Sequence, residues 1–114
     1  MKMVIDTVPG VDDAMAIMLA LSDPRVALLG LTTVFGNVPV TTATRNALHL
    51  LAVAGVGLPV AEGAARPLVQ APPPHPDFVH GPGGLGGVAV PEPETPPDPR
   101  GAAAFLCDVT AAHP

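Results

Sequence analysis

The stretch Val4-Ile5-Asp6-Thr7-Val8-Pro9-Gly10-Val11-Asp12-Asp13-Ala14 predicts the fold of this chain better than any other part of it. A short β-branched strand enters a Pro-Gly turn, and two adjacent carboxylates then begin an apolar helix. Asp6, Asp12 and Asp13 therefore gather at the carboxyl end of a first strand, which is where open α/β sheets bind ligands. Clustered carboxylate oxygens are the ligands that a hard cation such as Ca²⁺ or Mg²⁺ requires.

Hydrophobic periodicity predicts a β-α-β-α-β order over residues 1–66. The second strand is apolar along nearly its whole length, which suits a parallel strand covered on both faces. The fold class is therefore α/β, the N-terminal part of an open, doubly wound, mostly parallel sheet. The expected strands are Met3–Asp6, Val26–Val34 and Leu58–Ala61, and the expected helices are Asp12–Leu21 and Thr41–Ala54.

The rest of the chain divides into a loop and a last helix. Residues 67–100 are rich in Pro and Gly and show no usable period, which predicts extended and exposed backbone. A helical pattern over Arg100–Ala112 predicts a helix within residues 101–114. Cys107 stands among Ala, Phe and Leu on that helix, and we expect it to be a buried structural thiol. We expect residues 1–114 to hold one domain at most, since domains commonly hold about 100–150 residues.

Composition narrows the classes of partner and compartment. Ten acidic residues against five basic ones argue against nucleic-acid binding, which needs a basic face. One cysteine excludes an internal disulfide and fits a reducing compartment. The first apolar run is interrupted by Asp6 and is too short for a signal peptide, and the apolar part of the first helix is far below the ~20 residues that span a bilayer. We therefore expect a soluble cytoplasmic protein with no nucleic-acid and no membrane partner.

The opening stretch resembles the first motif of the inosine/uridine-preferring nucleoside hydrolases, Asp-x-Asp-Pro-Gly-x-Asp-Asp-Ala. Four further blocks resemble this family in the family's own order. They are Leu31–Asn37, a strand ending in Val-x-Gly-Asn; Thr44–Ala47, a Thr-Arg-Asn-Ala run; Val60–Gly63 with Arg66-Pro67-Leu68, a third strand and its turn; and His80–Gly86, a His-Gly-x-x-Gly-hydrophobic-Gly loop. The resemblance covers essentially the whole chain, but only about the first third of the family's domain.

The resemblance implies an α/β domain that hydrolyses the N-glycosidic bond of ribonucleosides to ribose and free base, with one bound Ca²⁺. It implies that Asp13 is a metal ligand, with Asp6 as a second ligand or as an anchor behind the metal. Asp12 and Asn37 would bind the ribose hydroxyls, and His80 would approach the base or leaving group. Simpler roles stay open, because adjacent aspartates also suit a helix start and the other polar residues also suit turns or loops.

Val8 departs from the family motif, which has an aspartate at this position. In the family that aspartate binds the metal and is placed to deprotonate the attacking water. Valine has no lone pair and no basicity, and loss of a general base typically costs on the order of 10²–10⁴ in rate. Ca²⁺ takes about 6–8 oxygen ligands, so the missing carboxylate weakens metal binding as well. We therefore expect weak Ca²⁺ affinity, and impaired or absent hydrolysis.

Three functions remain open at this point. The first is an enzyme of nucleoside hydrolase ancestry whose activity is impaired. The second is a pseudo-enzyme module that binds ribose, a cation or a protein partner without catalysis. The third is a gene remnant with no independent function. An unpaired sheet edge favours pairing with another chain, which predicts a homo- or hetero-oligomer through that edge.

Overall fold

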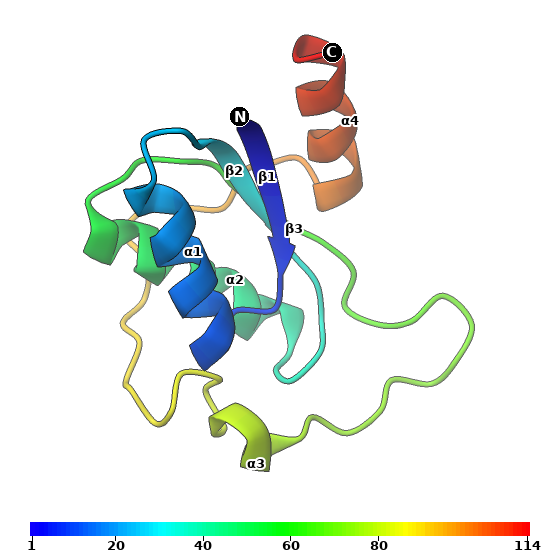
Figure 1. Ribbon diagram of the computed structural model, residues 1–114. Helices are drawn as coiled ribbons and strands as arrows, with labels where there is room; N and C mark the ends of the chain where they lie inside the picture. The colour runs from blue at the N-terminus through cyan, green and yellow to red at the C-terminus, as the bar shows by residue number, and fades with distance from the viewer.

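A three-stranded sheet with helices on both faces forms the centre of the computed structural model, which describes residues 1–114 (Figure 1). Figure 1 shows α1 and α2 together on one side of the sheet and α4 on the other. The strands are β1 (Lys2–Thr7), β2 (Ala27–Thr33) and β3 (Val60–Glu62), and the helices are α1 (Val11–Ser22), α2 (Val40–Ala54), α3 (Asp77–His80) and α4 (Ala102–Ala112). None of these helices is both long and apolar enough to cross a bilayer.

The strands are parallel and lie in the order β1-β2-β3. Thr7 pairs with Thr33, and Thr33 pairs with Glu62, so all three strands end at the same edge of the sheet. The loops that follow β1 and β2 therefore emerge side by side. This is the edge where an open α/β sheet binds ligands, and it is the α/β arrangement expected from the sequence.

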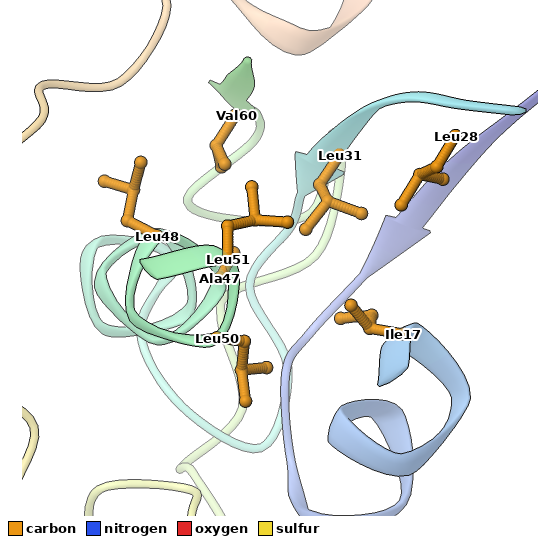
Figure 2. Close-up of a cluster of buried hydrophobic side chains, with 8 residues drawn as sticks. All are labelled: Ile17, Leu28, Leu31, Ala47, Leu48, Leu50, Leu51 and Val60. Atoms are coloured by element: carbon orange, nitrogen blue, oxygen red, sulfur yellow. The ribbon is translucent and has the colours of Figure 1, made fainter. Parts of the chain in front are cut away.

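A bulge in β2 sets which side chains reach the core. Met3 pairs with Leu28 and Val4 pairs with Gly30, so Leu29 is an extra residue in the ladder. An extra residue reverses the alternation of faces along a strand. Leu28 and Leu31 consequently both face α1 and α2, although three positions separate them (Figure 2).

The main core lies between the sheet and the α1–α2 layer. Each fully buried Leu, Ile or Val side chain stabilises the fold by about 1.5–3 kcal/mol relative to an exposed one. Figure 2 shows the cluster around α2, which supplies half of its eight residues, whereas α1 supplies one. The members are Ile17, Leu28, Leu31, Ala47, Leu48, Leu50, Leu51 and Val60.

One aromatic side chain attaches α4 to the opposite face of the sheet. Phe105 is 1% exposed, and its ring tip lies directly above Gly30 of β2. A Cβ atom at Gly30 would stand only 2.6 Å from Cζ of Phe105, so the ring fits because that position carries no side chain. On its other side the ring is covered by the Arg100 guanidinium, 4.9 Å from the ring centroid.

The five elements expected over residues 1–66 are all present in the expected order, with ends displaced by one to a few residues. Two expectations are wrong. The loop over residues 67–100 contains the short helix α3, whose first turn is closed by a bond from the Val79 N–H to the Pro76 carbonyl. Cys107 is exposed rather than buried, because α4 presents Phe105 to the sheet and a residue two positions further on points away from that face.

Candidate functional site

Asp13 is held at the carboxyl end of β1 by two hydrogen bonds. The buried Thr7 hydroxyl donates to Oδ1 of Asp13 at 2.7 Å. The N–H of Gly10, the residue before α1, donates to the other carboxylate oxygen at 3.3 Å. The carboxylate therefore has a fixed orientation in the first turn of α1, where the helix dipole favours a negative charge.

Asp12 and His80 come together across two loops. Nε2 of His80 lies 3.4 Å from Oδ1 of Asp12, and the Asp12 side chain is otherwise 80% exposed. The His80 ring is largely buried because it lies flat against Gly10, where a Cβ atom would stand 2.8 Å from Cδ2. Two residues that the sequence assigned to substrate binding are thus neighbours, although 68 positions separate them.

Asp6 points to the other face of the sheet. Neighbouring residues of a strand face opposite sides, so Thr7 turns toward α1 while Asp6 turns toward α4. Asp6 accepts a hydrogen bond from the Thr32 hydroxyl at 2.6 Å and lines a groove with Glu62 beside α4. The structure therefore does not bring Asp6 and Asp13 to a common point.

Val8 and Asn37 occupy the two adjoining loops. The half-buried Val8 side chain packs against Gly36, where a Cβ atom would lie 2.9 Å from Cγ2. Asn37, the next residue, is also half-buried. The position that would carry the family's aspartate is therefore an apolar contact between the loops after β1 and β2.

The side chains at this end of the sheet offer the type of oxygen ligand that a hard cation binds, but too few of them. Carboxylate and hydroxyl oxygens are what Ca²⁺ binds, and about 6–8 of them are needed. Asp13 is the one carboxylate held at the loop after β1, by its hydrogen bond from Thr7. The carboxylate of Asp12 lies against His80 instead. The structure has no group of three or more His, Cys, Asp or Glu side chains arranged around one metal position.

Sequence reasoning placed Asn46 in the Thr44–Ala47 block but missed that its side chain joins these loops. Asn46 of α2 is 0% exposed and donates from Nδ2 to the carbonyls of Pro9 and Gly83, at 3.2 and 2.8 Å. The available signal was a polar residue on an apolar helix face, because Asn46 follows Ala43 by three positions and precedes Leu50 by four. A second missed contact joins Nδ1 of a loop histidine, His75, to the Gly36 carbonyl at 2.7 Å.

Comparison with known families identifies this arrangement. Residues 3–114 match the sequence model of a family described as inosine-uridine preferring nucleoside hydrolase. The chain belongs to this family. The expected resemblance is thereby confirmed, together with the α/β fold class.

The family relatives are much longer than this chain. This chain is 49% identical to uridine nucleosidase 1 of Arabidopsis thaliana, and the match covers 99% of this chain and 34% of the relative. It is 41% identical to the inosine-uridine preferring nucleoside hydrolase of Leishmania major, over 98% of its length and 36% of the relative's. The chain thus spans about a third of the length of these relatives.

Solved structures of the family superimpose closely on this chain. A plant nucleoside hydrolase superimposes with a TM-score of 0.93 at 43% identity, covering 99% of this chain and 36% of the plant enzyme. A purine-preferring ribonucleoside hydrolase from Gardnerella vaginalis superimposes with a TM-score of 0.91 at 30% identity, covering 97% and 36%. The three strands and their helices therefore follow the N-terminal arrangement of the nucleoside hydrolase fold.

Proposed function

We propose that this chain forms part of a ribonucleoside-binding site, in which Asp13 serves a Ca²⁺ ion and Asp12 and Asn37 serve the ribose. The observation that carries this proposal is the double hydrogen bond on Asp13, from the Thr7 hydroxyl and the Gly10 N–H. A carboxylate fixed in this way is oriented before a ligand arrives. Family membership supports a small nucleoside as that ligand, since the curated relatives are named for uridine and inosine.

Each residue receives one role in this proposal. Asp13 contributes a carboxylate oxygen to the metal. Asp6 has a structural role instead, because its carboxylate is bonded to Thr32 of β2 on the opposite face of the sheet. Asp12 accepts hydrogen bonds from the ribose diol in place of its contact with His80. His80 then lies beside the ligand. A bound Ca²⁺ supplies charge that polarises a water or a sugar hydroxyl.

The same proposal assigns impaired or absent hydrolysis to this chain. Val8 cannot accept a proton, and its methyl groups pack against Gly36 where a base would stand. A non-catalytic module that binds ribose or a cation is therefore the second candidate, and the Val8–Gly36 contact favours it. The cytoplasmic location expected from the low cysteine content belongs to the same proposal.

Isothermal titration calorimetry with Ca²⁺ and with ribose tests this function. We expect the wild-type chain to bind both weakly. Asp13→Asn should abolish the heat of Ca²⁺ binding, and Asp12→Asn should abolish the heat of ribose binding while preserving that of Ca²⁺. The control is Glu94→Gln, an exposed charge in the loop before α4, which should change neither titration. Absence of heat for both ligands in the wild type would contradict the proposal.

A further inference from the structure

The amide of Asn46 lies between two backbone carbonyls from distant parts of the chain. Its Nδ2 donates to the Pro9 carbonyl, in the turn before α1, and to the Gly83 carbonyl, in the loop after α3. The side chain is fully buried on the apolar face of α2. An amide NH₂ group has two protons, so it can satisfy both carbonyls at once.

The chemistry of this contact fixes the orientation of the amide. Oδ1 of Asn46 is buried and has no hydrogen-bond partner. Turning the amide over would gain nothing for the nitrogen and would place Oδ1 against the two carbonyl oxygens. A donor is therefore required at this position, and an apolar or acidic side chain of the same size cannot replace it.

The two carbonyls belong to the segments that carry the candidate site. Pro9 precedes Asp12 by three positions, and Gly83 follows His80 by three. We call Asn46 and its two hydrogen bonds, to the carbonyls of Pro9 and Gly83, the clamp. The second segment also packs closely against it, because a Cβ atom at Gly84 would lie 3.1 Å from Nδ2 of Asn46. Gly84 has a φ of +82°, which favours glycine there as well.

We propose that Asn46 is a positioning residue of the candidate site, which holds the His80 segment against the turn that carries Asp12. Gly81, Gly84, Gly86 and Gly87 all have positive φ, and glycine restricts the backbone least, so contacts from outside the segment are needed to hold this conformation. Without the two bonds, the His80 ring leaves Gly10 and its 3.4 Å contact with Asp12 is lost. The consequence for ligand binding rests on the function proposed above, whereas the loop contact does not.

NMR spectroscopy of the full chain tests the clamp directly. Wild type should show a nuclear Overhauser effect between His80 Hδ2 and Gly10 Hα, because these groups touch. Asn46→Leu keeps the branching at Cγ, with a larger side chain, and removes both donors, so this signal should disappear. The amides of Gly84 and Gly86, bonded to the carbonyls of Gly81 and His80, should exchange at least about tenfold faster, while the β2 amides keep their protection.

The matched control is Thr44→Val on the same helix. The Thr44 hydroxyl is equally buried, and its partners are the Thr33 hydroxyl and the Val40 carbonyl, outside both loops. This variant should keep the His80–Gly10 signal and the slow exchange of the loop amides. The proposal is overturned if Thr44→Val loses the His80–Gly10 signal and the slow amide exchange as much as Asn46→Leu does. It is also overturned if the signal is unchanged in Asn46→Leu, or if wild type does not show it.

A second variant covers the case in which Asn46→Leu does not fold. Gly84→Ala adds a Cβ atom 3.1 Å from Nδ2 of Asn46 without altering α2, and it should also remove the His80–Gly10 signal. Retention of the signal would overturn the clamp. Uridine titrations separate the two proposals, because Asn46→Leu should weaken uridine binding relative to Thr44→Val. If wild type binds no uridine, the proposed function fails and the clamp is decided by the loop signals alone.

Discussion

Val8 is the residue at which the proposed chemistry of this chain departs most from the family motif. Its methyl groups fill the contact with Gly36, between the loops after β1 and β2. The family motif places a carboxylate at the same position, five residues before Asp13. An aspartate is smaller than a valine, so the loop has room for the exchange. The local backbone can therefore be preserved while the charge of the site changes by one unit.

Val8→Asp should raise the affinity for Ca²⁺ at least about tenfold, because charge count sets the affinity of carboxylate sites. Calorimetric titration with CaCl₂ measures the change. Val8→Thr is the matched control, since it has the shape of valine and a hydroxyl but no charge, and it should leave the affinity nearly unchanged. Equal affinities for the two variants would show that position 8 does not face the metal.

Sequence alone led us to propose the charged residues of the candidate site but not the groups that orient them. Asp12 and Asp13 can be recognised in the sequence because they are two carboxylates at a helix start that follows a strand and a Pro-Gly turn. Thr7 gave no signal, since a threonine in a strand has many ordinary uses. Its bond to Asp13 depends on the angle at which α1 leaves the strand, and this angle is a tertiary property.

At the scale of elements, α4 is tied to the chain before it by a charged cluster. Arg100 donates to Asp98 and to Asp108 of α4, each at 2.9 Å. The N–H of Asp98 donates to the Val60 carbonyl of β3 at 2.8 Å. Hydrogen bonds from the Arg100 side chain, followed by one from its backbone N–H, lower the pKa of Asp98 to about 2. The loop before α4 is thus joined to both the helix and the sheet.

Asp98→Asn should make the fold less stable at neutral pH but not in strong acid. The pKa of Asp98 is lowered by folding, so its contribution is complete above the ordinary value of 3.8 and is lost as the pH falls toward 2. Urea unfolding at a series of pH values measures the difference from wild type, which should narrow between pH 4 and pH 2. Glu94→Gln, at an exposed position, is the control. A difference that is constant over this range would contradict the prediction.

Gly30→Ala should loosen α4, because the new methyl group would stand 2.6 Å from the Phe105 ring and 2.9 Å from the Pro59 carbonyl. Overpacking of this kind costs about 1–3 kcal/mol. The loss should appear in urea unfolding and as faster proteolysis near Gly101. Gly57→Ala is the control, since a Cβ atom there meets nothing within 4 Å, and it should have no such effect. Comparable losses in both variants would contradict this role of Gly30.

Elements with a strong period were predictable, and those fixed by distant contacts were not. The first five follow from apolar patterns and their stop signals. The short helix α3 has only four residues and no period, so nothing in its own sequence distinguishes it from a turn. The exposure of Cys107 could not be read from α4 either, because most of that helix is apolar and its buried face is selected by the fit of Phe105 above Gly30.

At the scale of the whole molecule, α1 leaves an apolar surface uncovered. Met15 and Leu19, one helical turn apart, are 72% and 70% exposed. β1 is one of the two edge strands of the sheet. A helix that is apolar on every side is typical of the interior of a larger protein, and the relatives are about three times as long as this chain.

The isolated chain should therefore self-associate as its concentration rises, and Met15→Glu combined with Leu19→Lys should reduce that association. The two new charges form a favourable pair four residues apart, so the helix should not be weakened. Sedimentation velocity over a concentration series measures the effect. Val53→Lys, at a position of α2 that is 67% exposed, is the control. A wild-type chain that stays monomeric throughout, or an equal effect of the control, would contradict this prediction.

The position of Asn46 along the chain also determines when the site can exist. Pro9 lies 37 residues before it and Gly83 lies 37 residues after it. Closing loops of this length costs entropy that local elements do not need to overcome. During synthesis from the N-terminus, the motif carboxylates are made first, yet they meet His80 only after residue 83 has left the ribosome. All three strands and the α1–α2 layer precede residue 83, so they can pack before the two halves of the candidate site meet.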